Sequence, residues 1–225
     1  HVNNLTCDPS IRCVILTGTG NKAFCAGGDI SEFSQNLDKL DYLVREMTGF
    51  LHIGVSRLAR LHAPVIASIN GVAAGAGLSL MAICDLAIAC KSATFTSAYT
   101  KVGLSPDGSS TYFLQRLLNR RRLMELYLTN RVLDSKEALE WGLINKVVDD
   151  NFLEEETYKL ASSLANGPTL AYSSVKKLLN ETWTETLETQ MERETIEIAK
   201  MTQTQDAQNG IKSFIKKEKP NFNGK

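Results

Sequence analysis

The stretch that decides the fold is residues 65–78, which read VIASINGVAAGAGL. Its first five residues form an apolar, β-branched run of the length of a buried strand, and an Asn-Gly pair then turns the chain. Gly75 and Gly77 follow among very small residues where a helix begins, and each costs about 1 kcal/mol of helix stability relative to alanine. Their lack of a side chain predicts either close helix packing or a main-chain N–H, that of Ala76, which faces a ligand.

A second glycine-rich turn, CAGGD at residues 25–29, lies upstream, beyond a predicted strand at residues 13–17. Paired glycines permit positive φ and let a ligand approach the backbone closely. A helix follows, with Asp29 or Ser31 as its cap, so free N–H groups can form a cradle for an anion. Taken by itself, the segment is more simply a tight turn, and it has neither the GxxxxGK[ST] spacing of a phosphate loop nor a GxGxxG motif.

The composition is that of an ordinary globular protein, with 225 residues of which 43% are apolar. This length fits one domain, or one domain with an appendage. The 25 basic and 25 acidic residues balance, which argues against nucleic acid or an anionic membrane as a partner. The apolar runs are too short to span a bilayer. The five cysteines are odd in number and form no CxxC pair, so we expect reduced thiols, no metal site and a cytoplasmic location.

Strand and helix patterns alternate up to about residue 150, and the later sequence is helical. The sequence therefore predicts an α/β core at residues 1–150 and a C-terminal helical region at residues 151–225. A helix at residues 136–141 has Asp134 and Ser135 as its cap and Gly142 as its stop. The other predicted elements are strands at 13–17, 65–69, 85–90, 93–96 and 144–148, and helices at 37–61, 153–165, 170–183, 187–201 and 207–217.

The two turns, followed by CDLAIA (84–89) and KVGLSPDGSSTYFLQRL (101–117), resemble the crotonase (enoyl-CoA hydratase/isomerase) superfamily. The resemblance extends through EALEWGLINKVV (137–148) to GIKSFIKKEKPNF (210–222). It implies a spiral of ββα units with helices at the C-terminus, assembled as a homotrimer or a dimer of trimers. It also implies an acyl-CoA substrate, a place in fatty acid metabolism, and no separate cofactor, because coenzyme A is part of the substrate.

The resemblance also assigns roles to residues of the two turns. The N–H groups of Gly28 and Ala76 would form an oxyanion hole, which stabilises the enolate that arises when an α-proton leaves a thioester. Residues near the tail match positions that approach a neighbouring subunit's nucleotide, although a solvated basic helix end explains them equally well. The substrate-binding residues implied in this way are Lys22, Phe24, Ala26, Gly75, Tyr99, Phe214 and Lys217.

The catalytic base decides the reaction. Family hydratases carry two glutamates at positions that fall here on Ser79 and Tyr99, which argues against two-glutamate hydration. Asp107 stands in a Ser-Pro-Asp-Gly segment. Alone it would be a turn aspartate, but the segment resembles the isomerase branch, including ring-opened phenylacetyl-CoA isomerases and Δ3,Δ2-enoyl-CoA isomerases. In that branch one carboxylate moves a proton between two carbons, and we expect Asp107 to do so.

Other reactions stay open at this point. Hydration, hydrolysis or dehalogenation could use the same oxyanion hole with Asp107 as base or nucleophile, and a binding module could keep CoA affinity without catalysis. Tyr99 and Tyr112 could line an acyl pocket, although core packing explains both more simply. His52 and His62 have no Ser or Cys nucleophile placed beside them, so surface or packing roles are expected.

Overall fold

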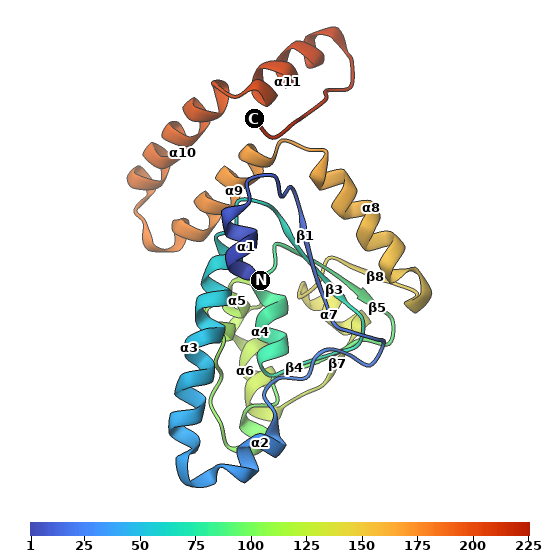
Figure 1. The fold of residues 1–225 in the computed structure, drawn as a ribbon, viewed down its shortest axis with the longest axis vertical. Helices are drawn as coiled ribbons and strands as arrows, with labels where there is room; N and C mark the ends of the chain where they lie inside the picture. The colour runs from blue at the N-terminus through green and yellow to red at the C-terminus, as the bar shows by residue number, and fades with distance from the viewer. The chain divides into compact units, whose positions relative to one another are not determined.

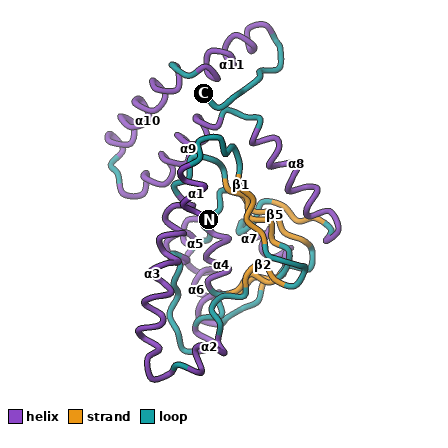
Figure 2. Tube along the Cα trace, in the orientation of Figure 1, coloured by secondary structure: helices purple, strands orange, loops and turns teal.

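The computed structural model describes residues 1–225, which divide into two compact units. The helical unit comprises residues 1–14, 60–65 and 158–225, and the core unit comprises residues 15–59 and 66–157. No helix combines the length and the apolar character needed to cross a membrane. Nearly all the strand residues belong to the core unit. The strands are coloured orange in Figure 2.

The strands form two four-stranded sheets. Figure 1 draws the strands as arrows. In both sheets parallel pairs join successive strands, such as β3 with β5 and β4 with β6, whereas β7 pairs antiparallel with β6. The first three passes of the chain each add one strand to each sheet and then a helix, as in the predicted spiral of ββα units, and the last pass runs β7, α7 and β8. The first sheet has the order β1 (Val14–Thr17), β3 (Val65–Ile69), β5 (Leu86–Cys90) and β8 (Lys146–Val148), and the second β2 (Ala23–Cys25), β4 (Val72–Ala74), β6 (Thr94–Thr96) and β7 (Leu133–Asp134).

The helices of the core unit begin and end where the sequence places caps. Asp29 accepts hydrogen bonds from the N–H groups of Ser31 and Glu32 and so caps α2, as predicted. Asp134 and Glu137 form a capping box at the start of α7, and Gly142 ends that helix at φ 81°. These helices are α2 (Ile30–Gln35), α3 (Leu40–Ala59), α4 (Ala76–Ala82), α5 (Ser110–Leu117), α6 (Arg120–Thr129) and α7 (Ser135–Trp141), with 3-10 turns at η1 (Leu37–Lys39), η2 (Thr100–Val102) and η3 (Asp150–Phe152).

The two strand-to-strand turns that lead to the glycine-rich segments are tied together. Asn70, at the end of β3, donates hydrogen bonds to the carbonyls of Gly18 at 3.0 Å and Gly20 at 2.7 Å, and accepts one from the Gly18 N–H at 3.1 Å. A Cβ on Gly71 would lie 2.3 Å from the Lys22 carbonyl oxygen, so only glycine fits there. The Asn-Gly pair therefore turns the chain and also fixes β4 beside β2.

The helical unit contains the helices predicted for the C-terminal region. All four agree with the predicted ranges within about two residues, because apolar residues recur there at helical spacing. The short helix α1 and the strands β2, β4 and β7 were not predicted. The helices of this region are α1 (Val2–Cys7), α8 (Leu153–Ala165, which begins in the core unit), α9 (Thr169–Glu181), η4 (Thr182–Thr184), α10 (Leu187–Thr202) and α11 (Gln205–Lys216).

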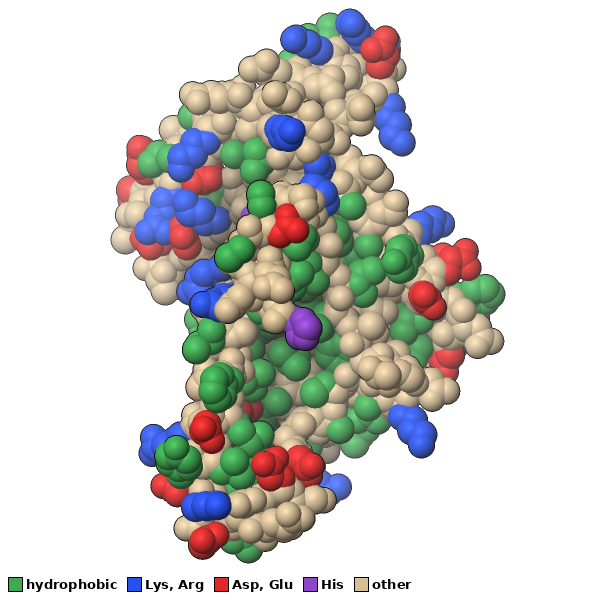
Figure 3. All heavy atoms as spheres, viewed as in Figure 1, with side chains coloured by type: hydrophobic (Ala, Val, Ile, Leu, Met, Phe, Trp, Pro, Cys, Tyr) green, Lys and Arg blue, Asp and Glu red, His purple; other side chains and the backbone are tan.

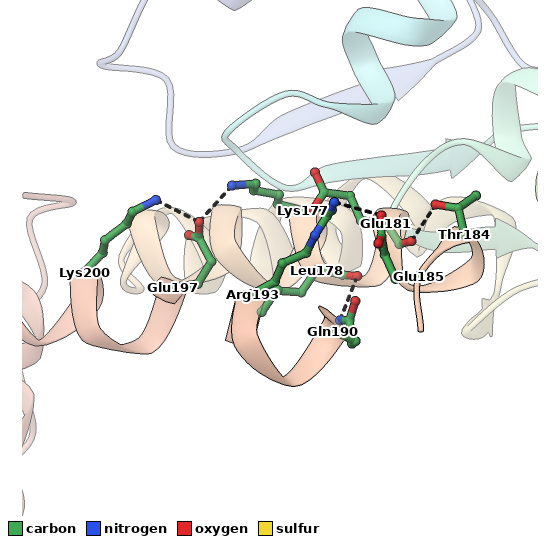
Figure 4. Close-up of polar contacts among 9 residues, drawn as sticks. All are labelled: Lys177, Leu178, Glu181, Thr184, Glu185, Gln190, Arg193, Glu197 and Lys200. Atoms are coloured by element: carbon green, nitrogen blue, oxygen red, sulfur yellow. Dashed lines mark hydrogen bonds and ion pairs between the residues drawn. The ribbon is translucent and has the colours of Figure 1, made fainter. Parts of the chain in front are cut away.

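A charge cluster joins α9 and α10 (Figure 4). The buried carboxylate of Glu197 accepts hydrogen bonds from Lys177 Nζ at 2.8 Å, Ser174 Oγ at 2.8 Å and Lys200 Nζ at 3.1 Å. The hydrogen bonds from Lys177 and Ser174 lower the pKa of Glu197 from its ordinary 4.5 to about 2. Arg193 makes further ion pairs with Glu181 and Glu185.

Replacing Glu197 by glutamine is expected to destabilise the protein at neutral pH and to matter less in acid. The pKa is lower in the folded state, so the carboxylate contributes stability above about pH 4.5 and loses it as the pH falls toward about 2. Urea unfolding of wild type and variant at pH 7 and pH 3 measures this difference. Glu192→Gln, an exposed change on the same helix, serves as the control. An equal loss of stability in Glu197→Gln at both pH values would contradict the stabilising role given to the ionised Glu197 carboxylate.

Candidate active site

The two glycine-rich turns lie against each other in the core unit. Gly27 has φ 96°, and a Cβ there would lie 3.1 Å from the Ala74 carbonyl oxygen and 3.5 Å from the Ala76 nitrogen. A Cβ on Gly77 would lie 1.9 Å from the Cys25 carbonyl oxygen, closer than any real side chain allows. Glycine is therefore required at both faces of this contact, and close backbone approach is what the bare positions provide.

Two main-chain N–H groups of these turns, those of Gly28 and Ala76, have no acceptor within the chain. The Gly75 N–H donates to the Thr96 carbonyl at 3.3 Å, which fixes the turn at φ 54°. The next N–H, that of Ala76, makes no hydrogen bond, and neither does the N–H of Gly28. Gly28 is exposed and Ala76 is half-buried, so both donors can reach an acceptor from outside.

Asp107 lies in the loop before α5, and only one of its two carboxylate oxygens accepts a hydrogen bond. Its Oδ1 accepts a hydrogen bond from Tyr99 Oη at 2.6 Å, and its main-chain oxygen accepts one from Ser79 Oγ at 3.0 Å. Its Oδ2 accepts none. The two following residues, Gly108 at φ 59° and Ser109 at φ 67°, both adopt left-handed conformations. The structure thus brings together Ser79, Tyr99 and Asp107, which the sequence singled out.

Tyr99 and Ser79 also connect this carboxylate to the second turn. Ser79 Oγ lies 3.2 Å from Tyr99 Oη and 3.4 Å from the Gly75 carbonyl oxygen. A Cβ on Gly75 would lie 4.0 Å from Tyr99 Cζ. Burial, together with the hydrogen bond to Asp107, raises the pKa of Tyr99 well above its ordinary value of 10.0, so its hydroxyl keeps its proton.

The chain matches a protein-family model over almost its whole length. The model of the enoyl-CoA hydratase/isomerase family matches residues 2–225. The chain belongs to this family. Its resemblance to the crotonase superfamily, and to the isomerase-like branch, is thereby confirmed, and so is its being a crotonase-family enzyme.

Relatives in this family differ in the reactions for which they are named. The 1,2-epoxyphenylacetyl-CoA isomerase of Escherichia coli K12 is 39% identical over 97% of this chain and 83% of its own length. The 4-chlorobenzoyl coenzyme A dehalogenase-1 of Arthrobacter sp is 37% identical over 84% of this chain and 69% of its own. The solved enoyl-CoA hydratase of Polaromonas sp. JS666 superposes with a TM-score of 0.92 at 32% identity, covering 98% of this chain and 86% of that one.

In this member of the enoyl-CoA hydratase/isomerase family, His52 contacts the loop that carries Asp107. It projects from α3, and its Nε2 accepts a hydrogen bond from the Gly108 N–H at 3.2 Å. The predicted surface or packing role did not include this contact, because 56 residues separate the partners in sequence. Leu51 also packs here, since a Cβ on Gly108 would lie 3.5 Å from its Cδ2. His62 lies beyond α3, with Nε2 2.9 Å from the Ile11 carbonyl oxygen.

The remaining predicted residues lie in varied surroundings, and the contacts expected of them stay predictions. Lys22 and Ala26 are exposed beside β2, whereas the Phe24 side chain is buried, so only its backbone is open to a ligand. In the helical unit the Phe214 side chain is 85% exposed and Lys217 ends α11 at φ 58°. The structure holds no group of three or more His, Cys, Asp or Glu side chains that could bind a metal ion.

Apolar side chains are exposed on the helices next to the site. The viewed face of the molecule has hydrophobic side chains gathered over α3 and α4 (Figure 3). On α3, Tyr42, Phe50 and Ile53 are each more than half exposed, as is Ile30 on α2. Tyr112 is 41% exposed on α5, where its ring contacts Phe113 and Arg116, outside the network of Asp107.

Proposed function

We propose that this enzyme moves a carbon–carbon double bond in an acyl-CoA thioester. The observation that carries the proposal is the single carboxylate of Asp107, which accepts a hydrogen bond from Tyr99, while Ser79 holds the main chain of the same residue. Tyr99 and Ser79 stand at the two positions where family hydratases carry glutamates. The relative named as an isomerase, at 39% identity, supports the same reaction class.

The two free N–H groups supply the electrostatic half of the chemistry. When a base removes the α-proton of a thioester, negative charge develops on the carbonyl oxygen. The N–H groups of Gly28 and Ala76 are preorganised donors for this oxygen, since the positive φ angles of Gly27 and Gly75 fix both turns. The loss of one such donor costs about 2.7–4 kcal/mol in a well-studied oxyanion hole of another enzyme class. Lys22, Phe24 and Ala26 would lie along the CoA arm of the substrate.

Asp107 supplies the proton transfer. Its Oδ2, which accepts no hydrogen bond within the chain, takes the proton from carbon 2 of a 3-enoyl thioester and returns it to carbon 4. The double bond moves from carbons 3 and 4 to carbons 2 and 3. Nothing is oxidised or consumed, so the step needs no cofactor beyond the CoA of the substrate itself.

A second candidate reaction uses Asp107 as a nucleophile. The 37% identical relative named as a dehalogenase favours this alternative, because dehalogenation places a carboxylate against an activated carbon. It predicts a covalent adduct of substrate and enzyme, which mass analysis after a single turnover would detect. The isomerase proposal predicts no adduct.

The assembly and setting that we propose follow the family resemblance. Large apolar side chains stay exposed on the C-terminal helices, including Trp183, Phe214 and Ile215. Such faces are typical of surfaces that a second subunit covers, which supports a homotrimer or a dimer of trimers. We place the enzyme in cytoplasmic fatty acid metabolism.

Turnover of a small panel of CoA thioesters tests the reaction class. We expect the wild-type enzyme to convert a 3-enoyl-CoA, or a ring-modified phenylacetyl-CoA, into an isomer and to leave a saturated acyl-CoA unchanged. Rapid hydration of a 2-enoyl-CoA, without isomerisation of the 3-enoyl-CoA or of the ring-modified phenylacetyl-CoA, would favour the hydratase alternative. Tight binding of CoA with no turnover of any member would favour the binding-module alternative.

A further inference from the structure

The hydroxyl groups of Ser79 and Tyr99 direct their protons to the same residue. The Ser79 side chain is fully buried, and its Oγ lies within hydrogen-bond distance of the Asp107 and Gly75 carbonyl oxygens and of Tyr99 Oη. The two carbonyl oxygens can only accept, and an ionised carboxylate can only accept as well. Tyr99 therefore gives its one proton to Asp107 Oδ1 at 2.6 Å, and Ser79 gives its proton at 3.0 Å to the main-chain oxygen of the same aspartate.

We propose that Tyr99 is a positioning residue that fixes one oxygen of Asp107, so that Oδ2 alone acts on the substrate, while Ser79 holds the main chain of Asp107 against the second turn. The inference rests on the proposed function and adds to it the means by which the base is oriented. It also gives Tyr99 a role other than the predicted contact with substrate, because its only proton is already engaged by Asp107.

Tyr99 donates its hydrogen bond to a charged group, the carboxylate of Asp107. Bonds from a hydroxyl to a carboxylate are short and roughly twice as strong as neutral ones, and they favour the ionised form of the acceptor. Tyr99 stays protonated because burial and this bond raise its pKa. The other titratable side chain at the loop is His52 on α3, which contacts the Gly108 N–H, not the carboxylate. Tyr99 is thus the neighbour that donates directly to a carboxylate oxygen of the base.

The test compares Tyr99→Phe and Ser79→Ala with the wild-type enzyme on the 3-enoyl-CoA of the panel. For Tyr99→Phe we expect kcat to fall by about 10- to 100-fold, the loss typical of one hydrogen bond to a charged group. We expect KM to change little, and the acid limb of the kcat/KM profile to move to higher pH. For Ser79→Ala we expect a smaller fall in kcat with the acid limb in place. Tyr158→Phe, an exposed tyrosine on α8, is the matched control and should behave as wild type.

The outcomes separate the two claims. An unchanged kcat and pH profile in Tyr99→Phe, or a raised KM with kcat intact, would overturn this inference while the proposed function stood. A wild-type enzyme without isomerase activity would overturn both. If Tyr99→Phe does not fold, 3-fluorotyrosine at position 99 keeps the size and gives a stronger donor, so the acid limb should move to lower pH. A profile that stays in place with 3-fluorotyrosine would also overturn the inference.

Discussion

Replacing Asp107 with asparagine is expected to lower kcat for isomerisation of a 3-enoyl-CoA by about 10²- to 10⁴-fold, the usual contribution of general acid–base catalysis. Asparagine has nearly the same shape, and its carbonyl oxygen can still accept the hydrogen bond from Tyr99. The variant should therefore fold and bind CoA as the wild type does. Initial rates with a 3-enoyl-CoA, together with thermal unfolding and CoA titration of the same preparation, measure the three quantities.

The matched control for this variant is Asp149→Asn. Asp149 forms an ion pair with Lys91 at the surface, where both side chains are more than half exposed. Such pairs contribute little to stability, so kcat and stability should both stay close to wild type. An Asp107→Asn enzyme that keeps kcat within a factor of a few of the wild-type value would show that another group is the base.

Replacing Gly77 with alanine is expected to have the largest effect on stability. The new Cβ would lie 1.9 Å from the Cys25 carbonyl oxygen, which belongs to the backbone and cannot rotate away, so the two glycine-rich turns would have to separate. We expect the free energy of unfolding to fall by more than about 4 kcal/mol, or the protein not to fold. Urea unfolding measures the change, and any folded fraction should show little of the proposed isomerase activity, because the N–H groups of Gly28 and Ala76, the two proposed oxyanion donors, would move.

Gly49→Ala provides the opposite case in the same unit. Gly49 lies within α3, and a Cβ there meets nothing within 4 Å. The substitution should raise the free energy of unfolding by up to about 1 kcal/mol, since alanine favours helix. If Gly77→Ala were as stable as Gly49→Ala, the close contact between the turns would be wrong.

The elements that the sequence predicted are those whose pattern is local. The β3 run is buried at every residue, and the C-terminal helices keep their apolar spacing over several turns. Strands β2 and β4 have three residues each, too few to show a period, and they pair because Asn70 and Gly71 fix the turns beside them. Their existence depends on contacts about 50 residues apart, which no local pattern contains.

The candidate site could be predicted only in part for the same reason. The glycines of the two turns predicted where the main chain is open to a close approach. The family resemblance marked Asp107 and the two positions that lack the glutamates of hydratases. The hydrogen bond from Tyr99 to Asp107 and the contact of His52 with Gly108 arise because the spiral brings α3, α4 and the loop before α5 together. A histidine in a long amphipathic helix gives no signal of such a partner.

The most direct test of the isomerase claim is the mass of the product formed from a 3-enoyl-CoA in water enriched with oxygen-18. We expect a 2-enoyl-CoA of unchanged mass that carries no heavy oxygen, because a proton moves from carbon 2 to carbon 4 and no water is added. A product heavier by one labelled water, or free CoA with a labelled acid, would contradict it.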